Sequence, residues 1–124
     1  MRAVLRAVRV MHDAGVEHLD LNFGNLLVRE PAGAAPEAFV VDLDRARLHG
    51  GALPVGKRRA ALLRMERSYL KSFGDGGPFP APRARAWAEA YAGNAPSLAG
   101  LLAAPGVVER ASLAIHRLGW RKAR

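Results

Sequence analysis

The hydrophobic pattern of the chain starts with an amphipathic helix over residues 2–14. Apolar residues recur there at helical intervals, while the arginines fall largely on the other side. The apolar face consists of Val4, Leu5, Val8 and Met11. Gly15 follows at a position where a glycine commonly ends a helix, so the pattern predicts that the helix stops there.

Two short apolar runs then predict a β-hairpin. They cover residues 26–29 and 38–42 and are joined by the turn-forming stretch P-A-G-A-A-P. The second run leads into Asp42, and Asp44 follows shortly after it. Residues 45–51 contain Arg, His and Gly, which indicates a turn rich in hydrogen-bond donors.

The second half of the chain predicts helices. They cover about 57–73, 83–92, 97–103 and 106–118, with a Gly- and Pro-rich loop over 74–82. The apolar stripe of the first of these helices consists of Leu62, Leu63, Met65, Tyr69, Leu70 and Phe73. Trp87 and Tyr91 lie one helical turn apart, and we expect both to anchor the core.

These elements predict one domain over residues 1–124 that is mainly α with a small β-hairpin. A chain of 124 residues can bury a modest core, and a hydrophobic content of 50% is typical of a globular protein. The absence of Cys excludes disulfides and thiolate metal sites and fits a reducing compartment. Arginines interrupt the first apolar residues, so no secretory signal is indicated. The uncharged run over 90–108 contains prolines and predicts a helix–turn–helix segment, not a membrane span.

The net charge of +8 is spread unevenly. The first 50 residues carry 6 basic and 7 acidic side chains, whereas the rest carry 13 basic and 4 acidic ones. The basic half suits an anionic partner, such as a phosphorylated glycolipid or an acidic membrane surface. Arg64, Arg67 and Lys71 lie opposite the apolar stripe and form either a phosphate-binding face or an ordinary solvated surface. The tail over 117–124, with Trp120, either rests on an anionic membrane or is a frayed terminus.

The strongest chemical signal is H-L-D-L-N-F-G-N, from His18 to Asn25, together with V-V-D-L-D-R-A-R further on. The signature of kinase-type phosphotransferases reads H-R-D-L-x-x-x-N and is followed downstream by D-F-G. The chain matches the first part at every defining position except the Arg, which is Leu19. Asp42, in D-L-D, takes the place of the D-F-G aspartate.

Phosphoryl transfer needs a positioned acceptor hydroxyl and Mg²⁺ held against the phosphates. We expect Asp20 to accept or orient the hydroxyl proton. Asn25 and Asp42 are expected to bind Mg²⁺ through an amide oxygen and a carboxylate. Asn22 is placed to hydrogen-bond the transferred phosphate or the acceptor. Asp44 is either a second metal ligand or the ion-pair partner of a neighbouring arginine.

His18 is interpreted as a scaffold residue, and the remaining histidines show no metal-ligand spacing. The plain alternative for the acidic residues is that Asp20 caps a turn while Asp42 and Asp44 form surface ion pairs. The sequence contains no internal repeat, no Walker-type loop and no zinc pattern. Its few aromatic residues are not interleaved with basic ones, so nucleic acid is not an expected partner.

Three stretches together, H-L-D-L-N-F-G-N-L-L-V, F-V-V-D-L-D-R-A-R-L and L-L-R-M-E-R-S-Y-L-K, resemble the lipopolysaccharide kinase family, in particular the Kdo kinases of the Gram-negative inner core. In that family the loop commonly reads H-x-D-L-N-x-x-N and the metal motif D-F-D is followed by basic residues. The resemblance covers roughly residues 1–73. The first motif is shared with aminoglycoside and choline phosphotransferases, whereas the other two favour the lipopolysaccharide enzymes.

The resemblance implies transfer of the ATP γ-phosphate to a sugar hydroxyl of the lipid A–core acceptor, at the cytoplasmic face of the inner membrane. It implies a catalytic role for Asp20 and Mg²⁺ binding by Asn25 and Asp42. It also implies a protein-kinase-like C-terminal lobe, with the two loops within 18–44 and a helical remainder over 56–118. The family's N-lobe has no counterpart in the sequence, so efficient transfer by this chain alone is not expected.

Two other functions stay open. A different small-molecule phosphotransferase, of the aminoglycoside or choline kinase type, shares the first motif. A catalytically inactive module would bind anionic ligands through the basic half, and its binding would not depend on Asp20, Asp42 or Mg²⁺.

Overall fold

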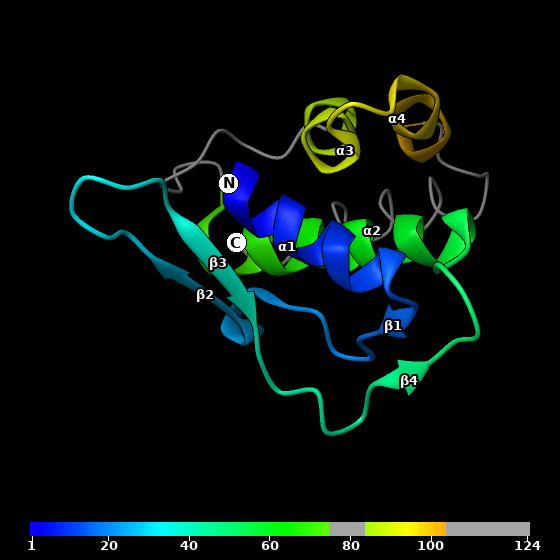
Figure 1. Cartoon of the computed structure of the whole chain (residues 1–124), viewed down its shortest axis with the longest axis horizontal. Helices are drawn as coiled ribbons and strands as arrows, with labels where there is room; N and C mark the ends of the chain where they lie inside the picture. Colours follow the sequence, from blue (N-terminus) through cyan, green and yellow to red (C-terminus); the bar gives the residue numbers. More distant parts are fainter. Residues whose placement is uncertain (75–83, 104–124) are drawn as a thin grey trace, which may run out of the picture.

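A computed structural model of the chain describes residues 1–74 and 84–103. Four α-helices, four short strands and one 3₁₀-helix lie within these ranges (Figure 1). In chain order they are α1 (Arg2–Asp13), β1 (Val16–Glu17), η1 (Phe23–Asn25), β2 (Leu26–Arg29), β3 (Glu37–Val40), β4 (Arg47–Leu48), α2 (Val55–Phe73), α3 (Ala84–Ala92) and α4 (Pro96–Ala103). The described part is therefore mainly helical with small antiparallel sheets, as the sequence pattern predicts.

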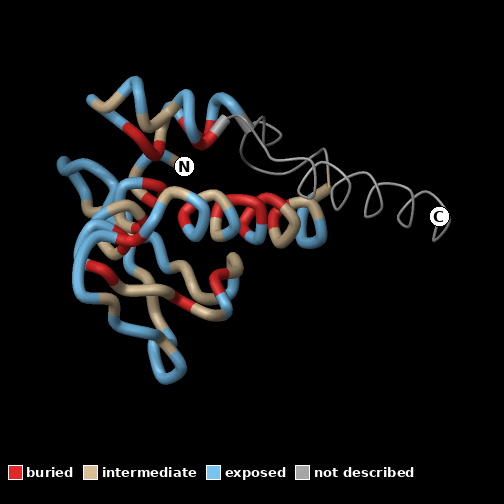
Figure 2. Tube along the Cα trace, turned by 90° about the vertical axis from the view of Figure 1, so that its right-hand side faces the viewer, coloured by how far each residue is buried: buried red, intermediate tan, exposed pale blue. Residues whose placement is uncertain are grey.

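Helices α1, α2 and α3 surround one hydrophobic core, and α4 packs on α3 (Figure 1). The β2–β3 hairpin lies at one end of α1, and the β1–β4 pair lies on the side away from α3 and α4. Figure 2 shows buried positions alternating with exposed ones along the helices, which is the burial expected of amphipathic helices.

The predicted helices are confirmed within the described residues, with small shifts at their ends. Helix α2 begins at Val55, two residues before its predicted start, and ends at the predicted Phe73. Helix α3 begins one residue after its predicted start, and α4 begins one residue before. Such shifts are usual at helix ends, where propensity and capping decide the boundary together.

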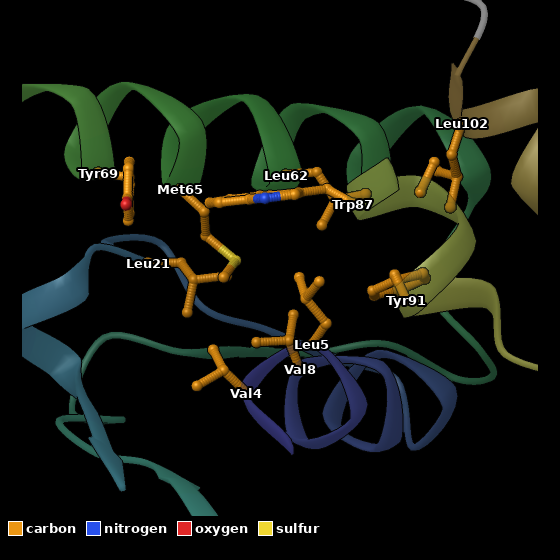
Figure 3. Packing of buried hydrophobic residues seen from close by; sticks show 11 residues of the cluster. Val4, Leu5, Val8, Leu21, Leu62, Met65, Tyr69, Trp87, Tyr91 and Leu102 are labelled. Atoms are coloured by element: carbon orange, nitrogen blue, oxygen red, sulfur yellow. The ribbon is translucent and has the colours of Figure 1, made fainter. Parts of the chain in front are cut away.

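The core is formed by the residues that the helical periodicity indicates (Figure 3). Val4, Leu5 and Val8 face inward from α1, and Trp87 and Tyr91 are buried as predicted. The prediction for Phe73 is wrong, because its side chain is 42% exposed. Phe73 is the last residue of α2, and its ring packs beside those of Phe23 and Tyr69 with centroids 6.1 and 5.2 Å away.

The hairpin forms with a ladder from Leu26↔Val40 to Arg29↔Glu37. Strand β2 has its predicted bounds, whereas β3 ends two residues before the predicted end at Asp42. The backbone explains the earlier end. Asp42 has a φ of 61°, a left-handed conformation that a β-strand cannot contain.

Strands β1 and β4 were not predicted, and β4 lies within the stretch expected to be a turn. They pair antiparallel with Val16 opposite Leu48. Gly15 makes this pairing possible, since its φ is 80° and a Cβ there would lie 2.4 Å from the carbonyl oxygen of Gly51. The backbone N–H of His49 donates to the Gly15 carbonyl at 2.8 Å. Strands of two residues carry no periodicity, so the sequence pattern could not reveal them.

A network of hydrogen-bonded polar side chains connects α1, α2 and α3. His12 Nδ1 lies 2.7 Å from the Tyr91 hydroxyl. Arg58 donates from Nη1 to that hydroxyl at 3.2 Å and to Asp13 Oδ1 at 2.6 Å, and from Nε to the Leu53 carbonyl at 2.6 Å. We call the four side chains His12, Asp13, Arg58 and Tyr91 the helix cluster.

Burial and charge decide the protonation of the helix cluster. A guanidinium can only donate, so the Tyr91 oxygen accepts from Arg58. Which of Tyr91 and His12 donates in their contact depends on the tautomer of the His12 ring. Burial, followed by the Arg58 charge, lowers the pKa of His12 to about 4. Burial raises the pKa of Tyr91 to about 12.

Three sequence predictions lie outside the described residues. They are the loop over 75–82, the helix over 106–118 and the basic tail over 117–124. Among residues 1–74 and 84–103, no helix combines the length and the apolar character that crossing a membrane requires.

Candidate active site

The loop that carries the kinase-like motif begins directly after β1 and is fixed by His18. The backbone N–H of Asp20 donates to His18 Nδ1 at 3.0 Å, and His18 Nε2 lies 3.0 Å from the Val41 carbonyl oxygen. Because an N–H must donate and a carbonyl must accept, these partners assign the ring proton to Nε2. His18 is buried and ties the loop to the strand that leads into Asp42.

Asn22 holds the carboxylate of Asp20. Its Nδ2 donates to Asp20 Oδ1 at 3.1 Å, and its Oδ1 accepts from the backbone N–H of Gly24 at 2.8 Å. The second bond caps the 3₁₀-helix η1 in the manner typical of Asn. Asp20 is exposed, so its carboxylate is accessible to a ligand while one of its oxygens is oriented by the loop.

Asn25 folds back on the same loop. Its Nδ2 donates to the Asp20 carbonyl oxygen at 2.8 Å, and its own carbonyl accepts from the Val41 N–H at 2.9 Å. Since Nδ2 is engaged, the amide oxygen of Asn25 is the side-chain atom left to take a ligand. Val41 is thus held on both its N–H and its C=O, directly before Asp42.

Asp42 has an unusual backbone and an exposed side chain. Within the described ranges it is the one non-glycine residue with a positive φ. Such a conformation costs on the order of 1–3 kcal/mol and often occurs at functional sites, where the surrounding structure imposes it. Here the two hydrogen bonds of Val41 supply that constraint. No ion pair of Asp42 is found among residues 1–74 and 84–103.

Asp44 is also exposed. Within the part of the chain that the structure describes, it forms no ion pair with Arg45 or Arg47, the alternative that the sequence left open. The turn that carries it is closed by a hydrogen bond from the Ala46 N–H to the Leu43 carbonyl at 3.0 Å. Its role as a second metal ligand remains a prediction.

The donor set suits a hard cation that is shared with a phosphate ligand. No group of three or more His, Cys, Asp or Glu side chains that could hold a metal occurs in residues 1–74 and 84–103. Mg²⁺ commonly takes one or two protein oxygens and completes its shell with water and phosphate. The exposed carboxylate of Asp42 and the unengaged amide oxygen of Asn25 fit that requirement, whereas a protein-only metal cage does not form here.

Two contacts from α2 were not predicted. The guanidinium of Arg64 donates to the Leu19 carbonyl oxygen, and Ser68 Oγ accepts from the Phe23 backbone N–H at 2.9 Å. Arg64 is thus neither a purely solvated side chain nor one placed only to bind phosphate. Its helical position showed which face of α2 it occupies, but not that the loop lies against that face.

A groove lies elsewhere, between α1 and the β2–β3 hairpin. Its volume is about 1260 Å³, and its walls include the exposed apolar side chains Val10, Val28, Phe39 and Leu43. Of the loop residues discussed above, neither Asp20 nor any of its hydrogen-bond partners lines it. The groove also has charged residues on its walls, Arg2, Arg6, Glu30 and Glu37, and it is separate from the loop chemistry.

A helix, a loop with H-x-D-L-x-x-x-N and a hairpin that leads into an aspartate follow one another in the order of the kinase signature, which indicates the kinase class. A family model agrees: that of the lipopolysaccharide kinase (Kdo/WaaP) family matches residues 1–91. The chain belongs to this family. Neither the curated proteins nor the solved structures compared with the chain gave a match.

The family match confirms the resemblance inferred from the motifs and extends it. The motifs supported residues 1–73, whereas the family model reaches Tyr91 and so includes most of α3. That added part supplies Trp87 and Tyr91 to the core. The family therefore spans both candidate loops, α2 and the helix cluster.

Proposed function

We propose that this chain carries the catalytic and metal-binding loops of an ATP-dependent phosphotransferase that phosphorylates a sugar hydroxyl of the lipopolysaccharide inner core. The main support is the set of hydrogen bonds that joins Asp20, Asn25 and the strand leading into Asp42. We infer further that the described residues correspond to the C-terminal lobe of a protein-kinase-like fold. The proposed place of action is the cytoplasmic face of the inner membrane.

In this proposal Asp20 acts on the acceptor. Its carboxylate orients the sugar hydroxyl and accepts its proton as the hydroxyl oxygen forms a bond to the γ-phosphorus. The bond from that phosphorus to the bridging oxygen breaks at the same time, and ADP leaves. Asn22 keeps the Asp20 carboxylate oriented through the bond at 3.1 Å.

Asn25 and Asp42, with Asp44 as a further candidate, would hold Mg²⁺ against the ATP phosphates. The ion would supply charge neutralisation of the phosphates. The left-handed backbone at Asp42 and the hydrogen bond between the Asn25 carbonyl and Val41 fix where the two ligands stand relative to each other. The chain's contribution is thus mainly positioning, which is what phosphoryl transfer asks of a protein.

The test is phosphate transfer from labelled ATP to a Kdo-containing core acceptor by the natural full-length protein. Asp20→Asn should abolish transfer while Mg²⁺-dependent ADP binding persists. Asp42→Asn should abolish Mg²⁺-dependent ADP binding and lower transfer strongly. Glu37→Gln is the matched control, because Glu37 is an exposed acid paired with Arg29 on the hairpin.

Two results would overturn the assignment. Mg²⁺-dependent nucleotide binding that survives Asp42→Asn would remove the metal role of Asp42. Binding of core glycolipid without any transfer, unaffected by Asp20→Asn, would instead indicate an inactive binding module. Transfer to an aminoglycoside or choline but not to the core acceptor would support the other phosphotransferase type, although the basic residues over 51–124 favour an anionic acceptor.

A further inference from the structure

Two side chains of helix α2 form hydrogen bonds with the backbone of the candidate catalytic loop, residues 18–25. Arg64 donates to the carbonyl oxygen of Leu19, and Ser68 Oγ accepts from the N–H of Phe23 at 2.9 Å. Arg64 and Ser68 are one helical turn apart and so lie on the same face of α2. Their two contacts bracket Asp20, one on each side of it in the sequence.

The apolar residues of the loop are held by the same helix. Leu21 is fully buried beside Met65 (Figure 3). The ring of Phe23 lies 5.5 Å from that of Tyr69, in an edge-to-face arrangement. With Leu21 and Phe23 packed inward, the side chain of Asp20 is left exposed on the opposite side of the loop.

We propose that Arg64 and Ser68 are positioning residues for phosphoryl transfer. They fix the backbone on both sides of Asp20, so that its carboxylate stays at the place where the acceptor hydroxyl must lie. Both contacts are made to the backbone of the loop and not to the Asp20 carboxylate. This inference rests on the proposed function, because it assigns these contacts to the same reaction.

The loop needs such support because its backbone between β1 and η1 belongs to neither sheet nor helix. The Leu19 carbonyl and the Phe23 N–H are not part of a ladder, and side chains of a long helix supply their partners instead. A catalytic group is placed more accurately when a rigid element holds it. A displacement of about 1 Å at the reacting group can cost on the order of 10²-fold in rate.

Core packing does not depend on these two side chains. Arg64 is exposed and Ser68 is half-buried, whereas the core face of α2 is formed by Leu62, Met65 and Tyr69. Removing either polar group should therefore change the rate of transfer more than the stability of the fold.

The first test is Ser68→Ala in the natural full-length protein, with Ser68→Thr as the conservative variant. Ser68→Ala should lower kcat about tenfold and leave KM for ATP within about twofold, because nucleotide binding does not use this contact. Ser68→Thr keeps an acceptor oxygen and should restore most of the rate. Ser72→Ala, an exposed serine on the same helix, is the matched control and should match wild type.

The second test is Arg64→Met, with Arg85→Met as the control for loss of an exposed arginine from a helix. Arg64→Met should lower kcat by a similar factor, about tenfold, and Arg85→Met should not. Hydrogen exchange gives a readout besides activity: the Phe23 amide should exchange faster in Ser68→Ala than in wild type. If Ser68→Ala does not fold, Arg64→Met and its control decide.

The outcomes separate this inference from the proposed function. Wild-type kcat in both Ser68→Ala and Arg64→Met, with Asp20→Asn inactive, would overturn the positioning role alone. Equal losses in the Ser72 and Arg85 controls would overturn it too, since the effect would then not be specific. Transfer that persists in Asp20→Asn would overturn the proposed function itself.

Discussion

The candidate active site and the helix cluster use similar polar side chains in opposite surroundings. In the helix cluster, His12 and Arg58 are 1% and 6% exposed, and each is bonded to the Tyr91 hydroxyl. In the candidate active site, Asp20 and Asp42 are exposed, and many of the hydrogen bonds around them go to the backbone of the loops.

This difference in burial separates a contribution to stability from a contribution to the proposed reaction. Buried polar groups that satisfy one another contribute to stability, and removing one leaves its partners unsatisfied. Exposed carboxylates contribute little to stability but stay accessible to substrate and metal. We therefore expect substitutions in the active site to change the reaction and substitutions in the helix cluster to change the free energy of unfolding. Four predictions test that separation.

The largest effect is expected at Asp42. Asp42→Asn should lower transfer by about 10²–10³-fold, since it removes the charge that would hold the metal against the phosphates. It should leave the free energy of unfolding nearly unchanged, because Asn tolerates the left-handed backbone. Transfer kinetics and urea unfolding of the same preparations measure both. A loss of stability that parallels the loss of rate would show that the two regions are not separate.

The helix cluster should give the chain a pH-dependent stability. The pKa of His12 is lowered to about 4, from 6.5 for an exposed histidine. Between these two pKa values the unfolded chain binds a proton that the folded chain does not. The free energy of unfolding should therefore fall by about 3 kcal/mol as the pH falls from 6.5 to 4. The contribution is fully present above pH 6.5.

His12→Gln tests this, since Gln can accept from the Tyr91 hydroxyl but does not titrate. Urea unfolding between pH 4 and pH 7 should give a flatter curve for His12→Gln than for wild type. Curves of equal slope would show that another group causes the acid sensitivity.

Gly15 lies between the two regions and should matter to both. Gly15→Ala would place a Cβ 2.4 Å from the Gly51 carbonyl oxygen in a backbone with a φ of 80°. We expect a loss of about 2–3 kcal/mol, from the left-handed backbone and from displacement of β4. Thermal unfolding measures it. Gly56→Ala is the control: a Cβ there meets nothing within 4 Å, and Ala should stabilise α2 by about 0.4–1 kcal/mol.

The smallest effect is expected at Arg58. Arg58→Met should cost about 2 kcal/mol, because the Leu53 carbonyl and the Tyr91 hydroxyl lose a donor; the partner Asp13 is half-exposed and can turn to water. Arg85→Met removes an exposed pair with Glu89 and should cost less than about 0.5 kcal/mol. Urea unfolding measures both losses. If Arg58→Met and Arg85→Met lowered the free energy of unfolding equally, the helix cluster would not contribute more to stability than an exposed ion pair.

The sequence predicted what depends on repeated patterns or on a motif. The helical period of Leu62, Met65 and Tyr69 locates the core face of α2, and H-L-D-L-N-F-G-N locates the loop. The burial of Trp87 and Tyr91 followed from the same periodicity. The family could also be inferred from the motifs. The range of residues that resembles the family was underestimated, because the motifs covered residues 1–73 and the family model matches residues 1–91.

Contacts between distant segments could not be predicted. His12 continues the inward face of α1 after Val8, yet the apolar pattern did not include it, and its partner Tyr91 belongs to a helix far along the chain. The same holds for Ser68 and Phe23. Helical spacing shows on which face of its helix a polar side chain lies. Only the folded structure shows which residue of another segment it contacts. The short pair β1–β4 depends on Gly15 and leaves no pattern of its own.

The pairing of β1 with β4 has a consequence for the evolution of this chain. Val16 and Leu48 lie opposite each other, so the segment that carries both loops leaves and rejoins the helical part at neighbouring points. The outer part of this segment can be lengthened without moving the helices, whereas Leu21 belongs to the core and has to stay. Loop-closure entropy rises only slowly with length, so insertions at the hairpin tip around Gly33 should be tolerated. Insertions between Asp20 and Asn25 should not be.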